Sequence, residues 1–222
     1  PVIDHPYLDR KKIKPCGARL NKDRLVIPLY NQTGEISTLQ FIGADGNKKF
    51  LTNGQVKDCY FRIGKPNGNV CIAEGFATAA SIHEATGYAV IVAFNAGKLV
   101  DCAKFIRSKM TKANLIICAD YDKVGIEKAT IAAEESNGVM IYPDFGENQE
   151  GFTDFNDLHV SRGLDAVRNA IIKDKVESNI LDADVKYSSV DVVQFVEDEH
   201  ILKRLSMYIS EKTYLPVSTV FL

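Results

Sequence analysis

Three acidic side chains follow two apolar runs of this 222-residue sequence, in a pattern that suits metal-dependent phosphate chemistry. Glu74 ends the run VCIAE, while Asp120 ends LIICAD and is followed two residues later by Asp122. If these runs are neighbouring parallel strands, the carboxylates meet at the sheet edge where α/β proteins gather their ligands. Clustered carboxylates repel one another unless a cation neutralises them, and Mg²⁺ or Mn²⁺ prefers such oxygen ligands.

Further polar residues fall at positions from which they would reach the same edge. Asp154 and Asp157 lie in TDFNDL, which follows the next apolar run. Gly75 lets the backbone turn tightly beside a phosphate, and Lys98 and Lys123 follow two of the strand ends. Taken singly, each of these signals is weak, because an Asp after a strand is usually a helix N-cap and a lone lysine is as often merely solvated.

The elements that must position these residues alternate between strands and helices over residues 68–175. Strands are predicted for the runs NVCIAEG, YAVIVAFN, NLIICAD and VMIYPDF, and helices for the segments between them, the first of which is closed by Gly87. Runs rich in Val and Ile without alternation indicate a parallel sheet that is covered on both faces. We therefore expect a Rossmann-like α/β fold with a parallel four-stranded sheet.

Residues 1–67 have a different character, with short strand-like runs separated by Asp-Gly and Asn-Gly turns. These turns predict a small antiparallel sheet over residues 24–64. Residues 1–68 hold 12 Lys and Arg against 6 Asp and Glu, whereas the rest of the chain holds 15 against 23. The excess of positive charge indicates either a nucleic-acid partner, for which Lys48 and Lys49 beside the ADGN turn are candidates, or a solvated surface. Residues 176–222 are predicted to form a linker and a C-terminal helix.

Composition excludes several classes of protein. No apolar run approaches the roughly 20 residues that span a bilayer, so we expect a cytoplasmic protein without a membrane partner. The five cysteines are odd in number and lack CxxC spacing, so we expect reduced thiols and no zinc site. A GxxxxGK[ST] loop for ATP hydrolysis is also missing from the sequence.

Four motifs, in this order, resemble the toprim domain shared by primases, topoisomerases and some nucleases. They are AEGFATA at 73–79, AFNAGKL at 93–99, ADYD at 119–122 with Gly125, and TDFNDL at 153–158. The resemblance covers about residues 69–173 and points to the primases of phages, plasmids and integrated mobile elements. The HPYL sequence at 5–8 and the strands after it are also similar to what precedes toprim in those primases.

The resemblance implies roles for individual residues. Glu74 matches a glutamate that acts as general acid or base, and Asp120 and Asp122 match the Asp-x-Asp that binds a divalent metal. Asp154 matches the first acid of the later motif. We therefore take Glu74, Asp120, Asp122 and Asp154 as candidate metal ligands, and the first three as the catalytic residues.

Two positions depart from the pattern of the family. Asn156 stands at the second acidic position of the later motif, and Thr78 stands where cellular primases often carry an acid four residues after the glutamate. Both departures leave fewer ligands for a second ion. The departure at Thr78 favours the mobile-element branch of the family.

The sequence thus predicts the catalytic fragment of a DNA primase, which uses Mg²⁺ or Mn²⁺ to make RNA primers from nucleoside triphosphates on single-stranded DNA during replication. In the longer protein, a zinc-binding domain and a helicase are the expected neighbours. A toprim nuclease and a catalytically silent nucleic-acid-binding module are the alternatives. Residues 120–124 (DYDKV) superficially match the DxDx[TV] signature of haloacid-dehalogenase-type phosphatases. That reading fits poorly, because the signature follows the first strand of that fold, whereas two predicted strand–helix units precede it here.

Overall fold

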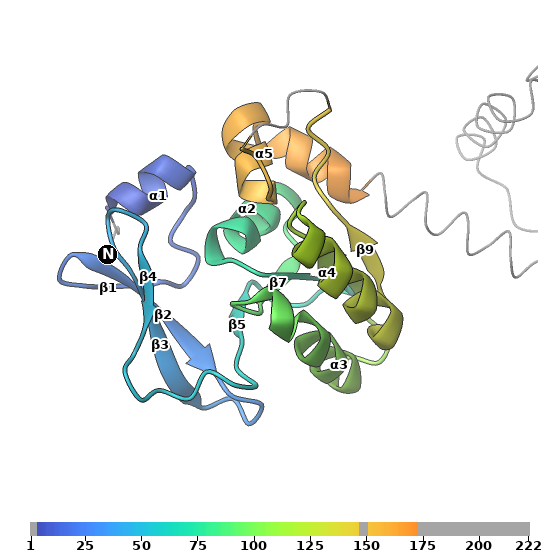
Figure 1. Cartoon of the computed structure of the whole chain (residues 1–222), viewed down its shortest axis with the longest axis horizontal. Coiled ribbons are helices and arrows are strands. Elements are labelled where there is room, and N and C mark those ends of the chain that lie inside the picture. The colour runs from blue at the N-terminus through green and yellow to red at the C-terminus, as the bar shows by residue number, and fades with distance from the viewer. Residues whose placement is uncertain (1–3, 147–150, 173–222) are drawn as a thin grey trace, which may run out of the picture. The chain divides into compact units, whose positions relative to one another are not determined.

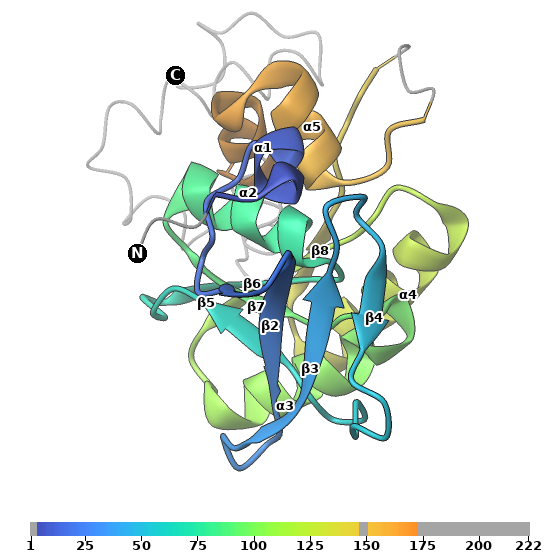
Figure 2. The same ribbon diagram turned by 90° about the vertical axis from the view of Figure 1, so that its left-hand side faces the viewer.

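The computed structural model describes residues 4–146 and 151–172, which form two β-sheets (Figures 1 and 2). One sheet is antiparallel and comes from the N-terminal part of the chain. The other is mostly parallel and has helices on both faces, so the predicted α/β class is confirmed. In this part of the chain, every helix is too short or too polar to cross a membrane.

The N-terminal sheet is an antiparallel meander. Its strands, in spatial order, are β1 (Arg19–Asn21), β2 (Arg24–Tyr30), β3 (Ile36–Ile42) and β4 (Lys48–Phe50). The turn before β4 is the predicted Asp-Gly turn, in which the Asp45 carboxylate accepts a hydrogen bond of 3.0 Å from the Asn47 N–H. Because side chains alternate along a strand, Lys48 and Phe50 lie on one side of β4 and Lys49 on the other.

The second sheet has a central strand that pairs in parallel on both sides. Its strands, in spatial order, are β5 (Phe61–Ile63), β7 (Ala89–Val92), β6 (Asn69–Ala73), β8 (Asn114–Cys118) and β9 (Val139–Ile141). β6, β7, β8 and β9 run parallel, and β5 is an antiparallel edge strand beside β7.

Helices cover both faces of this sheet (Figure 1). They are α2 (Phe76–Thr86), α3 (Leu99–Lys109), α4 (Lys123–Ser136) and α5 (Phe155–Arg162), with α1 (Pro6–Lys11), the 3-10 helix η1 (Ala96–Lys98) and helical residues 164–172. Along β6, Val70 and Ile72 belong to the core shared with α3 and α4, whereas Cys71 and Ala73 belong to the core shared with α2 and α5. This alternation is why the strand is apolar throughout.

The structure differs from the prediction in which strands pair. We expected β5 to close the N-terminal antiparallel sheet, but it pairs with β7 instead. The alternation of Phe61 and Ile63 around an exposed Arg62 predicts a strand without indicating its partner. β1 was not predicted, because its three residues are all exposed. The domain boundary at residue 68 stays a prediction, and the predicted linker and C-terminal helix lie outside the described residues.

Side-chain contacts hold the N-terminal segment against the helices of the parallel sheet. The Asn156 amide donates to the Lys11 carbonyl (2.8 Å), and the Glu84 carboxylate accepts from the Lys14 N–H (2.7 Å). Tyr7 belongs to the same buried cluster as Phe76 of α2. These contacts fix α1 and the residues directly after it relative to α2 and α5.

Arg107, close to the end of α3, connects that helix to the end of α4. Its guanidinium donates hydrogen bonds to the carbonyl oxygens of Ser136 (2.6 Å), Asn137 (2.9 Å) and Ala113 (2.8 Å). No other residue type offers five donors in one planar group.

We expect Arg107→Met to lower the free energy of unfolding by about 2 kcal/mol, because it removes charge-assisted hydrogen bonds and leaves carbonyl groups unpaired. Urea denaturation measures the change. Lys104→Met on the same helix is the matched control, and its effect should be far smaller because its ion pair with Glu135 is exposed to solvent. Equal losses in the two variants would contradict this role of Arg107.

Candidate active site

The register of β6 and β8 brings the first two candidate acids together. Ala73 pairs with Cys118, so Glu74 and Asp120 follow neighbouring strands at the same edge of the sheet. Glu74 is half-buried, and the nearby backbone of Ala96 favours the charged form of its carboxyl group. Burial, together with the nearby negative charges, raises the pKa of Glu74 above its usual range.

Asp120 lies within electrostatic reach of the other acids. Burial raises its pKa from 3.8 to about 7, and the charges of Asp154, Glu74 and Asp122 contribute to this rise, while Lys48 opposes it. Its Oδ1 atom is buried and has no hydrogen-bond partner. A buried carboxylate oxygen in this state is destabilising unless a cation or a donor reaches it.

Asp122 is exposed and forms the N-cap of α4, where its Oδ1 atom accepts a hydrogen bond of 2.7 Å from the Gly125 N–H. The helix therefore begins at Lys123. A methyl group on Gly125 would lie 2.4 Å from the Asp120 carbonyl oxygen. Glycine is therefore needed for the loop to hold both aspartates in place.

Asp154 forms the N-cap of α5. Its Oδ1 atom accepts from the N–H groups of Asn156 (2.7 Å) and Asp157 (2.9 Å), and its Oδ2 atom accepts from the Thr78 hydroxyl (3.2 Å). Asn156 is fully buried, and its amide also donates to the Ser81 hydroxyl (2.9 Å). The two positions that depart from the family pattern thus serve here to orient Asp154 and to attach the N-terminal segment.

Comparison with known proteins identifies the parallel sheet and its helices. Residues 69–165 match the toprim domain family. These residues form a toprim domain. Two Escherichia coli proteins, both named DNA primase TraC, are 32% identical over 157 residues and 31% identical over 162 residues. The matches cover 63% and 64% of this chain but only 11% and 15% of those relatives, so the chain spans a small part of their length.

Solved structures share the fold beyond the toprim domain. The primase fragment of the bacteriophage T7 primase-helicase protein gives a TM-score of 0.58 at 16% identity, covering 74% of this chain and 73% of that one. Primase domains of the T7 gp4 protein, solved with a T7 lagging-strand DNA polymerase, an RNA/DNA hybrid and dTTP, give 0.57 at 16% identity, covering 74% and 89%. At this identity the likeness establishes the fold alone.

The acids of the toprim domain suit a hard divalent cation. Within residues 4–146 and 151–172, no three His, Cys, Asp or Glu side chains converge into a complete metal cage. Mg²⁺ does not require one, because it keeps several waters and is usually held by one or two carboxylates together with substrate phosphates. The buried, unpartnered Oδ1 atom of Asp120 is the ligand that the site offers, and the residues present therefore fit such an ion.

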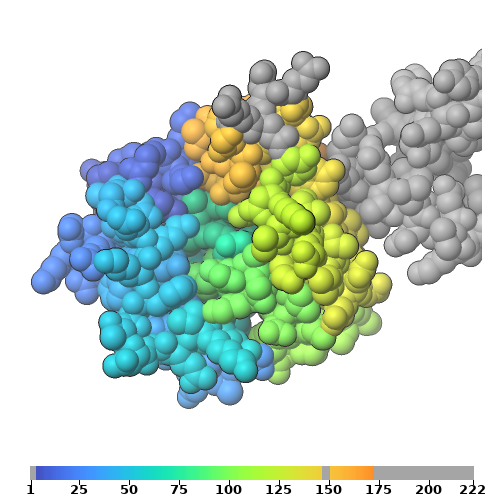
Figure 3. Space-filling view, in the orientation of Figure 1, coloured from blue at the N-terminus to red at the C-terminus, as the bar shows by residue number. Residues whose placement is uncertain are grey.

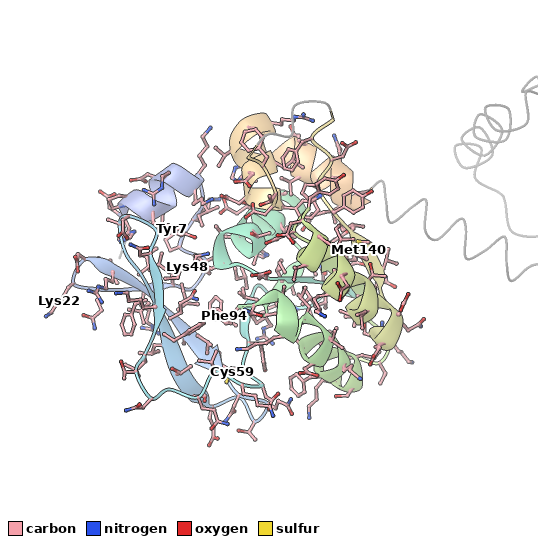
Figure 4. All side chains as sticks on the ribbon, in the orientation of Figure 1. Tyr7, Lys22, Lys48, Cys59, Phe94 and Met140 are labelled. Atoms are coloured by element: carbon pink, nitrogen blue, oxygen red, sulfur yellow. The ribbon has the colours of Figure 1, made fainter. Side chains whose placement is uncertain are left out.

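Lys48 brings a positive charge from the N-terminal sheet to the acids of the toprim domain (Figure 4). A methyl group added at Gly75 would lie 3.9 Å from its Nζ atom, and its charge acts on both Glu74 and Asp120. Lys49 lies on the opposite side of β4. The two lysines that the sequence grouped together therefore occupy different environments.

The other predicted contacts to nucleotide or DNA lie in different settings. The Lys98 ammonium donates to the Val56 carbonyl (3.0 Å) and lies 6.0 Å from the centre of the Phe50 ring, so it holds the segment after β4. Lys123 is exposed at the first position of α4. Gly75 is the N-cap of α2. Their roles in binding stay predictions.

Sequence reasoning gave no role to two residues beside the acids, Tyr7 and Phe94, which Figure 4 labels. The Tyr7 hydroxyl is buried without a partner, and burial and the charge of Asp154 raise its pKa to about 12. Phe94 has a φ of 65° and donates its N–H to the Glu74 carbonyl oxygen (2.9 Å). A left-handed aromatic residue costs about 1–3 kcal/mol and is typical of functional loops. The HPYL and AFNAGKL motifs were the available signals.

The raised pKa of Asp120 makes a prediction about stability. Because ionising this carboxyl is harder in the folded chain, its ionisation lowers the free energy of unfolding as the pH rises from about 4 through 7. With a chelator present, Asp120→Asn should raise the Tm at pH 8 by roughly 2–4 °C, the shift that about 1 kcal/mol gives in a chain of this size. The gain should be smaller at pH 5.

Glu134→Gln, which removes an exposed carboxylate on α4, is the control for these thermal melts. It should change the Tm by a similar small amount at both pH values. An Asp120→Asn variant that melts like the control at pH 8 would show that Asp120 is not under electrostatic strain.

Proposed function

We propose that this chain is the catalytic part of a DNA primase, which joins ribonucleotides into RNA primers on a single-stranded DNA template during replication. The observation that carries the proposal is the buried, unpartnered carboxylate oxygen of Asp120, set among three further acids and facing Lys48. The relatives named DNA primase and the fold shared with the T7 primase fragment support it. Those relatives are much longer, so a zinc-binding domain and a helicase are proposed as further parts of the complete protein.

The acidic residues would have different roles in this reaction. Asp120 and Asp122 would hold Mg²⁺ or Mn²⁺, with Asp154 as a further ligand, and the ion would neutralise the triphosphate and stabilise the in-line transition state. Glu74 is suited to act as general acid or base, because burial raises its pKa toward the working pH.

Lys48 supplies the complementary charge. Its ammonium group faces the acids across the boundary between the two sheets, where it would contact a phosphate of the incoming nucleotide. A phosphate bound there would lie between the lysine and the ion, which together offset its negative charge. Lys123 at the start of α4 and Lys49 on the outer side of β4 are proposed contacts for the strand.

Primer synthesis with labelled ribonucleotides on single-stranded DNA tests the proposal. Asp120→Asn and Asp122→Asn should reduce the rate by at least roughly a hundredfold, because charge stabilisation in the transition state commonly contributes that much. Glu74→Gln should lose rate as well, through the acid or base step. Cleavage of the template in place of primer synthesis would show a nuclease, and binding without either reaction would show a silent module.

The two lysines of β4 give a matched pair. Lys48→Met should lower the rate of synthesis at saturating template, because its ammonium faces Glu74 and Asp120. Lys49→Met should act on template affinity alone, flattening the log–log dependence of affinity on salt by about 0.7 for one lost phosphate contact on a single strand. Fluorescence anisotropy at several salt concentrations measures that slope. Identical effects of the two substitutions on rate would contradict the orientation of β4.

A further inference from the structure

Two tyrosines stand exposed at the ends of neighbouring strands, directly beside the catalytic aspartates. Tyr121 lies between Asp120 and Asp122 after β8, and Tyr142 follows β9. They are 38% and 42% exposed, and their ring centroids lie 5.0 Å apart with an interplanar angle of 37°. Large exposed aromatic surface of this kind, beside a candidate active site, is typical of a binding surface.

The pair forms one wall of an open groove against α4. Figure 3 shows the α4 segment, in yellow-green, on the near face of the molecule. The groove is lined by Tyr121, Asp122, Lys123, Ile126, Glu127 and Tyr142. The backbone holds Tyr121 in place, since its N–H donates a hydrogen bond of 2.6 Å to the Thr153 carbonyl. Lys123, the next residue but one, places a cation at the same groove.

We propose that Tyr121 and Tyr142 form a stacking platform for an unpaired base of the nucleic-acid strand that enters the active site. Aromatic rings bind bases through their π-faces, and a nearby lysine contacts the phosphate that follows, which is the usual combination in single-strand binding. The inference rests on the proposed function, which places a strand at this edge of the sheet.

The shape of the groove favours a strand over a free nucleotide. The platform is open and partly apolar, with Ile126 beside the rings, so it recognises the face of a base and not its hydrogen-bonding edge. A single open stacking contact binds a free nucleotide weakly. A strand that is also held by the basic N-terminal residues gains the contact without further loss of freedom.

The chain contains no tryptophan, so Tyr142→Trp introduces one indole that reports directly on the platform. In the full 222-residue chain with a chelator and without nucleotides, an oligothymidylate should quench the indole fluorescence of this variant. Ile36→Trp, which places an indole at an exposed position of β3 in the other sheet, is the control and should not be quenched.

Affinity gives an independent readout. Tyr142→Leu should weaken binding of the same oligothymidylate about tenfold or more, whereas Tyr142→Phe, which keeps the ring, should bind like the unmodified chain. Thermal melts of both variants show whether the fold is retained. Unchanged affinity in a folded Tyr142→Leu, or an unquenched indole in Tyr142→Trp, would overturn the inference.

A free nucleotide is the competing occupant of the groove. Quenching by ATP alone, as strong as by the oligonucleotide at equal concentration, would overturn the assignment to a strand and make the groove a nucleotide site. The quenching assay requires no primer synthesis. A chain that binds through the platform but makes no primers would therefore contradict the proposed function and leave the stacking platform in place.

Discussion

The main constraint in this structure is the burial of Asp120 beside three other carboxylates. Like charges held this closely destabilise the folded chain, and the register of β6 against β8 leaves no alternative, because it brings Glu74 and Asp120 to one edge. The offsetting charge comes from elsewhere in the sequence, since Lys48 reaches the acids from β4. The antiparallel sheet is therefore part of the candidate active site and not merely its neighbour.

The acids differ in how the fold restrains them. Asp122 and Asp154 cap the helices α4 and α5 and accept backbone hydrogen bonds there. Those contacts fix the orientation of two of the carboxylates before any ligand arrives. The Oδ1 atom of Asp120 is buried without such a partner, so the stability of the site depends on whether a cation or a hydrogen-bond donor binds there. Preorganised charge of this kind is a principal source of catalysis in phosphoryl transfer.

Much of this could be predicted from the sequence, for definite reasons. Apolar runs ending in Glu74 and Asp120 predict buried parallel strands, and the sheet edge follows from them. The pairing of strands was harder to predict, because the pattern around Phe61 predicts a strand that fits either sheet. Side-chain contacts between residues far apart in the sequence could not be predicted. Only the structure shows that Lys98 donates a hydrogen bond to the Val56 carbonyl. The different sides of Lys48 and Lys49 follow from strand alternation once β4 has been placed.

A calorimetric titration with Mn²⁺ tests the central claim, that these carboxylates form a divalent-cation site, most directly. The unmodified chain should bind Mn²⁺, and binding should weaken as the pH falls below about 7, because protons compete for Asp120. Asp120→Asn should lower the affinity by about tenfold or more, whereas Glu134→Gln should leave it unchanged. Equal Mn²⁺ affinity in the Asp120→Asn variant and the unmodified chain would contradict the account.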